Sequence, residues 1–362
     1  MILNSANKKE EPKFVLSKKK ILEQWTLVNE ICDVVSYSSK TNPLITKILE
    51  KNTCSLFSIH LINELKHVKD KSRVLFFAQG WDQQDLKELI NMNVTSFVVD
   101  NEFDLDELVS FLEKRSIKVN LFLRARLQEN TIKTERYFVF GMPSEIINKR
   151  IVELRTNEKI KNKIKQLGIH FHRKTQNMSE WNLKNEFEDI IDEKIFSLID
   201  IVNIGGGLPA EYANTNKKVI ETIFEKINEF RKWLNKEGMK MMVEPGRFIA
   251  APSGKLQVEI VRMYNNNIIV NASVYNSDMD ALIVPVKLLV ENEFSANDPD
   301  VKPYAIKGAT PCSMDIYRYK VYMKNPQVGD KIVFLNAGAY NFSTDFCELE
   351  KIKTDVLEDF MD

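Results

Sequence analysis

The sequence predicts an α/β fold in which a TIM-like (β/α)8 barrel is followed by a C-terminal β-sandwich or β-barrel domain that also takes the N-terminal strand. Three observations indicate this fold. Apolar runs alternate with charged helical stretches up to about residue 250, roughly eight such runs occur, and the pattern changes beyond Pro252. Alternating strands and helices imply parallel strands, and eight such units close into a barrel. The expected domains are a barrel over residues 17–250 and a β domain over residues 1–16 and 251–362.

The elements can be placed in chain order. Residues 14–16 are typical of a short strand, and Ser17 is a suitable N-cap for a helix with apolar residues at helical spacing. Barrel strands are expected at the apolar runs 33–37, 55–59, 74–77, 96–99, 119–123, 169–172, 199–204 and 240–243. The β-branched and aromatic runs 256–263, 268–275, 281–290 and 331–334 predict strands of the β domain, and helical periodicity returns only at 354–360.

The composition excludes several classes of partner. Lys+Arg and Asp+Glu both number 51, so no global field favours nucleic acid or an anionic membrane, and we expect a small-molecule substrate. No window reaches about 18 uninterrupted apolar residues, and the polar residues 1–12 lack the apolar stretch of a secretion signal. The four cysteines are scattered, which argues against a disulfide framework or a zinc ribbon and favours a cytoplasmic location.

Two loops after expected strands are candidates for anion binding. Gly205, Gly206 and Gly207 follow an apolar run, where a backbone without side chains could wrap a phosphate, although a plain turn is an equal alternative. The run Glu244-Pro245-Gly246-Arg247 places an acid at a strand end and a guanidinium just beyond it. The acid could pair with a pyridinium nitrogen and the guanidinium with a phosphate, or the two could form a local ion pair around a Pro-Gly turn.

Basic side chains lie at two other strand ends. His170 and His172 alternate on one expected strand and so share a face. They could bind a metal, but no third ligand cluster is apparent, so we expect stacked or hydrogen-bonded histidines and no metal. Lys40 ends the first barrel strand among small polar residues, where desolvation would make it a Schiff-base nucleophile. An exposed surface lysine is the alternative.

Together these segments resemble the pyridoxal 5′-phosphate (PLP) decarboxylases of the alanine-racemase fold type (fold type III), the ornithine, arginine and diaminopimelate decarboxylase family, from Phe14 to Tyr340. The resemblance implies that Lys40 carries the cofactor as a Schiff base and that His172 stacks on its ring. The other implied cofactor contacts are Arg124, Gly205, Gly206, Gly207, Glu244 at the pyridine nitrogen, Gly246, and Arg247 and Tyr340 at the phosphate. Cys312 falls where the family inserts a cysteine from the second subunit, which implies a homodimer with shared active sites.

The chain also departs from the family pattern. After His172 the usual glycine and serine are missing, and Thr175 is the candidate replacement for the serine hydroxyl. The spacing from Cys312 to Asp315 is one residue tighter than in the family. Val284 stands where diaminopimelate decarboxylases have a substrate-binding arginine, and Pro285 stands where ornithine decarboxylases have an aspartate.

The resemblance implies decarboxylation of an amino acid, expected to be a basic one of the ornithine, lysine or arginine type and connected with polyamine biosynthesis. In this hypothesis Cys312 reprotonates Cα and Asp315 binds the distal group of the substrate. A diaminopimelate-type decarboxylase and an amino-acid racemase are alternatives, and Glu244 favours decarboxylation over racemisation. A non-catalytic PLP-binding regulatory paralogue is a third alternative, against which the retention of Lys40, Glu244 and Cys312 counts.

Overall fold

The computed structural model describes residues 10–127, 139–179, 181–215, 217–341 and 343–360, in two compact units. The barrel unit comprises residues 22–209 and 217–246, and the sheet unit comprises residues 1–21, 210–216 and 247–362. The chain therefore enters the sheet unit again between residues 210 and 216, inside the range that the sequence gives to the barrel domain. This division also places the Glu244-Pro245-Gly246 segment in the barrel unit and Arg247 in the sheet unit.

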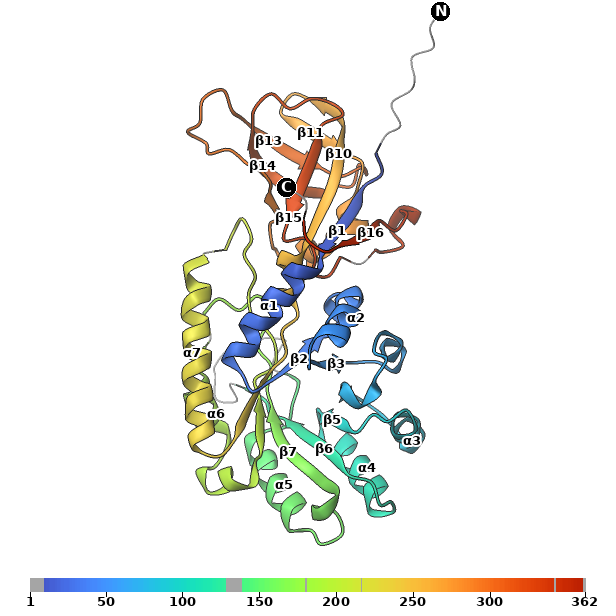
Figure 1. Ribbon diagram of the computed structural model, residues 1–362, viewed down its shortest axis with the longest axis vertical. Coiled ribbons are helices and arrows are strands. Elements are labelled where there is room, and N and C mark those ends of the chain that lie inside the picture. Colours follow the sequence, from blue (N-terminus) through green and yellow to red (C-terminus); the bar gives the residue numbers. More distant parts are fainter. Residues whose placement is uncertain (1–9, 128–138, 180, 216, 342, 361–362) are drawn as a thin grey trace, which may run out of the picture. The chain divides into compact units, whose positions relative to one another are not determined.

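The barrel unit is a closed barrel of eight parallel strands surrounded by helices (Figure 1). The strands are β2 (Val34–Ser38), β3 (Leu56–Ile59), β4 (Val74–Ala78), β5 (Ser96–Val99), β6 (Val119–Arg124), β7 (Ile164–His170), β8 (Ile201–Asn203) and β9 (Lys240–Val243), and β9 pairs with β2 to close the ring. The expected TIM-like barrel is thus confirmed. Because all eight strands are parallel, the residues that follow them meet at one end of the barrel.

Helices alternate with these strands, and several of them begin at capping residues. The main helices are α1 (Lys18–Ile31), α2 (Pro43–Asn52), α3 (Gln83–Asn91), α4 (Glu102–Glu113), α5 (Ser144–Thr156), α6 (Leu183–Ile190) and α7 (Lys217–Lys236). The Ser17 hydroxyl accepts the backbone N–H of Lys20 at 3.1 Å, as expected for the N-cap of α1. Asp82 caps α3 in the same way, through two backbone N–H groups of the first turn.

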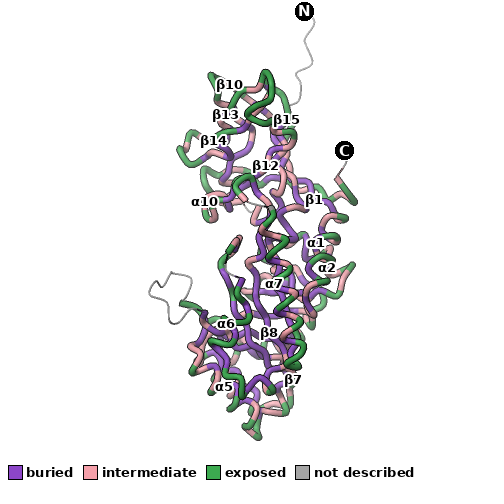
Figure 2. The backbone as a smooth tube through the Cα atoms, turned by 90° about the vertical axis from the view of Figure 1, so that its left-hand side faces the viewer, coloured by how far each residue is buried: buried purple, intermediate pink, exposed green. Residues whose placement is uncertain are grey.

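The core of the barrel is filled by apolar side chains that several strands contribute. Its central cluster consists of Leu75, Val98, Phe122, Ile201 and Met242. Gly168 in β7 lets the Phe122 ring into this interior, because a Cβ at residue 168 would lie 2.5 Å from the ring. Figure 2 shows the buried residues along the strands and exposed residues along the surrounding helices. The barrel is therefore a packed core, and any chemistry is confined to its end.

The sheet unit contains a mixed eight-stranded sheet in the order β12-β15-β10-β11-β13-β14, with β1 pairing β10 and β16. The strands are β1 (Lys13–Ser17), β10 (Gly254–Tyr264), β11 (Asn267–Val270), β12 (Leu289–Val290), β13 (Lys302–Lys307), β14 (Ile316–Met323), β15 (Lys331–Leu335) and β16 (Lys353–Leu357). Three four-residue helices, α8 (Arg247–Ala250), α9 (Val274–Ser277) and α10 (Asp280–Ile283), belong to the same unit. The expected uptake of the N-terminal strand is confirmed.

Three expectations about local structure were wrong. The helix expected at residues 354–360 is the strand β16, which gains a parallel partner in β1 from the other end of the chain. The strand expected at 281–290 is the short helix α10 followed by the two-residue β12. The strand β7 ends at His170, so His172 lies beyond it. Among the described residues, no helix has the length and apolar character needed to cross a membrane.

Candidate active site

Lys40 lies in a single 3-10 turn, η1 (Ser39–Thr41), directly after β2. Its side chain is exposed at the end of the barrel, yet desolvation by the surrounding protein lowers its pKa, against the opposing charges of Glu244 and Glu64. The turn is packed against the end of β9, because a Cβ at Gly246 would lie 2.3 Å from the Thr41 hydroxyl oxygen. Local packing therefore requires a glycine at residue 246, independently of any ligand.

Glu244 follows β9 and is a buried carboxylate surrounded by donors. Its Oε1 accepts hydrogen bonds from the Ser58 hydroxyl and the Asn203 amide, both at 3.0 Å, and its Oε2 lies 3.4 Å from His170 Nε2. Burial alone would raise its pKa, but the interaction with His170 and the hydrogen bond of Asn203 outweigh burial and lower the pKa to about 2. The structure thus holds Glu244 ionised at neutral pH.

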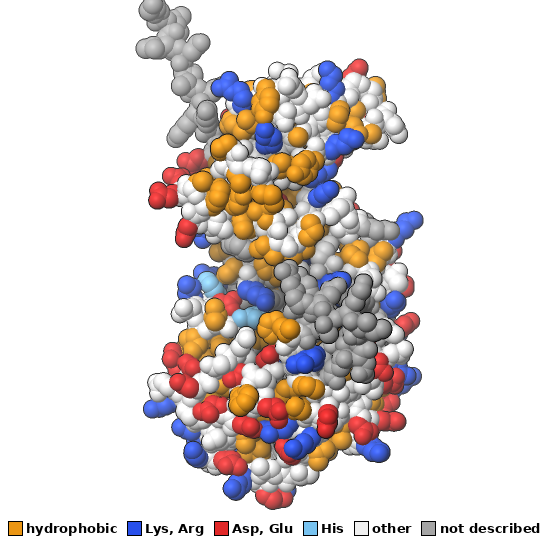
Figure 3. Space-filling view, turned by 180° about the vertical axis from the view of Figure 1, so that it is seen from behind, with side chains coloured by type: hydrophobic (Ala, Val, Ile, Leu, Met, Phe, Trp, Pro, Cys, Tyr) orange, Lys and Arg blue, Asp and Glu red, His pale blue; other side chains and the backbone are white. Residues whose placement is uncertain are grey.

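The two histidines after the seventh barrel segment have different environments. His170 is buried at the end of β7, and His172, two residues later, exposes its ring to solvent. The rings are nearly parallel, with centroids 6.4 Å apart, so the expected shared face is retained although only His170 is in the strand. Desolvation, before any charge effect, lowers the pKa of both rings and keeps them neutral. Figure 3 shows histidine side chains reaching the surface of the barrel unit beside charged groups.

The sequence offered no third group for a metal next to these histidines, but the structure supplies one. Potential ligand atoms of His170, His172 and Glu244 all lie within 4.8 Å of one another. Glu244 is 74 residues from His170 in the chain, and only the closure of the barrel brings them together. The same carboxylate already accepts hydrogen bonds from Ser58 and Asn203, so its charge is partly satisfied without a cation.

The glycine loop after β8 is held against this cluster. A Cβ at Gly205 would lie 2.5 Å from the Phe171 carbonyl oxygen, and a Cβ at Gly206 would lie 2.9 Å from the Glu244 carbonyl oxygen. The N–H of Gly205 donates to Asn203 Oδ1, and the N–H of Gly206 donates to His172 Nδ1 at 3.2 Å. Two of the three N–H groups expected to bind a phosphate are therefore engaged within the protein. Gly207 adopts a positive φ of 91° at the end of the loop.

Arg124 ends β6, as expected, and forms an ion pair with Asp100 at 2.8 Å. Its guanidinium also lies over the Phe140 ring, 4.9 Å from the centroid. Thr175 lies half-buried in the loop between β7 and α6. Arg173, in the same loop, is buried, and its charge is compensated by an ion pair with Glu186.

In the sheet unit, Arg247 is a buried cation that is already paired. Its two terminal nitrogens bind both carboxylate oxygens of Asp280, and NH1 also bonds the Tyr212 hydroxyl at 3.0 Å. The Tyr340 ring lies beneath the guanidinium, with its centroid 5.0 Å from Cζ. The sequence predicted Arg247 and Tyr340 as phosphate contacts but not Asp280, which pairs with Arg247 and neutralises its charge within the unit.

Cys312 and Asp315 have separate roles in the sheet unit. The Cys312 thiol is half-buried and lies 3.0 Å from the Tyr275 hydroxyl, which lowers the thiol pKa. Asp315 is only 1% exposed and accepts hydrogen bonds from Ser273, Val274 and Thr310. This carboxylate organises a loop of its own unit and has no open face. The structure therefore argues against the expected contact between Asp315 and a substrate.

The sequence missed several polar groups at the barrel end: His60, Ser58, Asp100 and Asn203. Each lies at, directly after or one residue before the end of a strand, which is the signal that could have identified them. His60 is the most important omission, because its Nε2 lies 3.1 Å from Lys40 Nζ.

Comparisons with known proteins agree with this fold and site. A family model described as the pyridoxal binding domain of pyridoxal-dependent decarboxylases matches residues 18–251. A probable chloroplastic diaminopimelate decarboxylase of rice is 24% identical over 92% of this chain and 71% of its own. The lysine decarboxylase of Selenomonas ruminantium superposes with a TM-score of 0.78 at 19% identity, covering 96% of this chain and 93% of its own.

The lysine/ornithine decarboxylase of Vibrio vulnificus, solved with cadaverine, superposes with a TM-score of 0.76 at 19% identity and covers 96% of this chain and 94% of its own. At this identity the two solved structures show a shared fold. The family model covers well over half of the chain and spans Lys40, His172 and Glu244. This chain belongs to the family of pyridoxal-dependent amino-acid decarboxylases, whose cofactor is PLP.

Proposed function

We propose that this enzyme decarboxylates a basic amino acid of the lysine or ornithine type, releasing carbon dioxide and an amine. The observation that carries the proposal is the presence, at one end of one barrel, of the Lys40 amine and the buried, hydrogen-bonded carboxylate of Glu244. A lysine amine forms the covalent link to an aldehyde cofactor. A carboxylate held ionised beside the cofactor favours a protonated ring nitrogen.

The barrel end fits PLP. The Lys40 amine and the His172 ring are both exposed there, so neither is blocked by protein. Gly205 and Gly206 bring the backbone against His172 and Glu244 without adding side chains over the site. Arg124, fixed by Asp100, adds a cation at a neighbouring strand end. For Arg247 and Tyr340 the support as phosphate contacts is the family resemblance alone, because Arg247 is paired with Asp280 inside the sheet unit.

Each residue then has a defined task. Bound PLP supplies the electron sink for the loss of carbon dioxide. Glu244 would keep a proton on the ring nitrogen by charge pairing, and His172 would lie against the ring and exclude water. Cys312 delivers a proton to Cα after carbon dioxide has left, and the Tyr275 hydroxyl 3.0 Å away stabilises the thiolate that remains.

The substrate class is inferred from relatives and from two positions of this chain. The similar structures include a lysine decarboxylase and a lysine/ornithine decarboxylase, and the rice relative is named as a diaminopimelate decarboxylase. Val284 offers no cation for the second carboxylate of diaminopimelate, which favours a substrate with a single carboxylate. The product would be a diamine, consistent with a place in polyamine biosynthesis.

We further propose that the enzyme is a homodimer in which Cys312 serves the site of the partner subunit. The support is the family resemblance and the half-buried position of the Cys312 thiol on the sheet unit. The four cysteines are free thiols, of which Cys54 and Cys347 are exposed. Exposed thiols persist in a reducing compartment, which supports a cytoplasmic location.

The test is carbon dioxide release from L-lysine, L-ornithine, L-arginine and meso-diaminopimelate by the purified protein. We expect release from lysine or ornithine, its loss in Lys40→Ala, and its retention in Lys47→Ala, where an exposed lysine of α2 is removed. Release from diaminopimelate alone would establish the alternative substrate. Racemisation without carbon dioxide, or PLP binding without turnover, would overturn the proposal in favour of a racemase or a non-catalytic paralogue.

A further inference from the structure

The Lys40 amine has a partner that the family resemblance did not provide. His60 immediately follows β3, the neighbour of β2 in the barrel, and its Nε2 lies 3.1 Å from Lys40 Nζ. The two residues are 20 positions apart in the chain, and the parallel pairing of β2 with β3 brings their strand ends together. This contact is a hydrogen bond at the atom that reacts with the cofactor.

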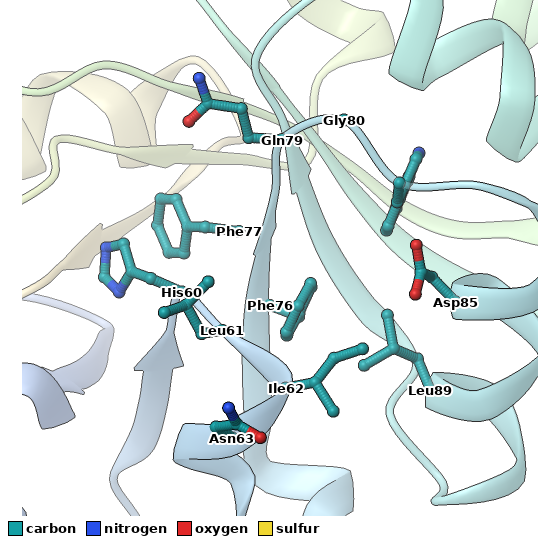
Figure 4. Close-up of a pocket in the computed structure, with 11 residues that line it drawn as sticks. His60, Leu61, Ile62, Asn63, Phe76, Phe77, Gln79, Gly80, Asp85 and Leu89 are labelled. Carbon is teal, nitrogen blue, oxygen red and sulfur yellow. The ribbon is translucent and has the colours of Figure 1, made fainter.

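The His60 ring is held firmly in place. It stacks on the Phe77 ring of β4, with centroids 4.8 Å apart and planes 10° apart, and Figure 4 shows the two rings as neighbours. The backbone N–H of His60 donates to Glu64 Oε2 at 2.7 Å, which anchors the start of the 3-10 helix η2 (Ile62–His67). The plane of the ring and its backbone are thus both fixed before any ligand binds.

The surrounding charges favour one tautomer of the His60 ring. His60 Nδ1 lies 3.9 Å from the same Glu64 oxygen, and a carboxylate on that side favours a proton on Nδ1. The lone pair of Nε2 then points to Lys40. Desolvation, followed by the charge of Lys40, lowers the pKa of His60 to about 3 and keeps the ring neutral. The titratable groups that act on His60 are Lys40, Glu64, Arg124, His170 and Glu244.

We propose that His60 is a further catalytic residue, whose neutral imidazole accepts a hydrogen bond from Lys40 Nζ and holds that nitrogen in one position whenever it is not bonded to the cofactor. The proposal rests on the assignment of Lys40 as the cofactor lysine. A lysine has a flexible four-carbon stem, so an unheld amine spends most of its time away from the attacking geometry. His60 removes this freedom and speeds both the loading of the cofactor and the return of Lys40 after each turnover.

The structure also shows where added imidazole could take the place of the His60 ring. His60 and Phe77 line a pocket of about 290 Å³, with Phe76 and Leu89 among its apolar walls (Figure 4). Removing the imidazole by His60→Ala would leave a ring-sized gap that opens toward this pocket. Imidazole added to the solution can stack on Phe77 in that gap and accept the hydrogen bond of Lys40.

The experiment measures the rate at which PLP attaches to Lys40. The full-length enzyme is stripped of cofactor with hydroxylamine and mixed with PLP, the covalent link is fixed with borohydride, and the modified peptide is identified by mass spectrometry. His60→Phe keeps the stack on Phe77 without an acceptor, and His60→Gln keeps an acceptor. His67→Phe makes the same exchange at the far end of η2 and serves as the matched control.

We expect attachment to be about tenfold slower in His60→Phe, within about threefold of the parent in His60→Gln, and unchanged in His67→Phe, as for the loss of one hydrogen bond. Imidazole should restore the rate of His60→Ala, and more so above the pKa of free imidazole, because only the neutral form accepts. Parent-like attachment in folded His60→Phe, or no recovery of His60→Ala with imidazole, would overturn the role of His60. An adduct at another lysine in the parent would instead overturn the assignment of Lys40.

Discussion

Glu244 illustrates how single residues are prepared for their chemistry. The carboxylate is only 6% exposed, an environment that would normally favour the protonated form. Hydrogen bonds from Ser58, Asn203 and His170 reverse this preference. Because these three donors come from β3, β8 and β7, the ionised state of Glu244 is a property of the closed barrel, whereas its position after β9 is a property of the local sequence.

Replacing Glu244 by Gln should lower kcat by about tenfold or more, the order expected when a preorganised charge at the reacting group is lost. Cofactor loading should change less, because Lys40 still forms the covalent link. Steady-state kinetics with the substrate identified by the carbon dioxide assay, together with the amount of bound PLP, would check this. Asp100→Asn, which weakens the ion pair that supports Arg124, serves as a comparison. An unchanged kcat in Glu244→Gln would be incompatible with its proposed role.

At the scale of elements, the buried pair of Arg247 in α8 and Asp280 in α10 links two short helices of the sheet unit. Both side chains are buried, and the contact is bidentate. Such a pair contributes little net stability, but removing one partner leaves the other charge uncompensated. The second acid of this region, Asp278, is also buried, and desolvation, followed by the charge of Asp280, raises its pKa.

Asp280→Ala should therefore lower the free energy of unfolding by about 3–5 kcal/mol, the range for a broken buried ion pair. Asp355→Ala, which breaks a surface pair with Lys13 in the same unit, should cost only about 0–1 kcal/mol. Denaturant midpoints of both variants would measure the difference. If Asp280→Ala and Asp355→Ala have equal midpoints, Arg247 must bind another anion in Asp280→Ala. Added phosphate or PLP would then raise the midpoint of Asp280→Ala and not that of Asp355→Ala.

At the scale of the whole molecule, the proposed composite site in a homodimer makes a specific prediction. Subunits carrying Lys40→Ala and subunits carrying Cys312→Ala should each have little amine-forming activity alone. A mixture that exchanges subunits should recover up to about a quarter of the parent activity per site, because half of the dimers are mixed and one of their two sites regains both residues. Mass spectrometry of differently tagged subunits would confirm the exchange. Mixed dimers without recovery would exclude the shared site.

The barrel unit should also lose stability in acid, for a reason that can be traced to its histidines. Histidines in an unfolded chain have a pKa near 6.5. In the folded protein, desolvation lowers the pKa of His60 to about 3 and also lowers the pKa of the buried His170. The unfolded state therefore binds more protons below about pH 6.5, and stability falls as the pH drops. Glu244 adds to this loss of stability below pH 4.5, because folding lowers its pKa from 4.5 to about 2.

The melting temperature of the cofactor-free protein should accordingly fall between pH 7 and pH 4, and less steeply in His60→Phe, which has one fewer proton to take up. Thermal unfolding at several pH values would measure both slopes. Identical slopes would show that His60 is charged or solvated in the folded protein.

The sequence by itself determined the architecture of this protein and the positions of Lys40, Arg124 and Glu244 at strand ends. Strand periodicity is local, and parallel strands place their ends together by topology, so the pattern was sufficient for these features. Local pattern failed at residues 354–360, because β16 exists through its pairing with β1 from the opposite end of the chain.

Only the tertiary structure decided what those side chains contact. The contacts of His60 with Lys40, of Asn203 with Glu244 and of Asp280 with Arg247 join residues 20 or more positions apart, and no motif spacing encodes them. Burial likewise gives Asp315 a structural role that its sequence position could not reveal. Hydrogen bonds and desolvation depend on distances of a few ångströms between elements. These distances are set by packing within the barrel unit and, separately, within the sheet unit.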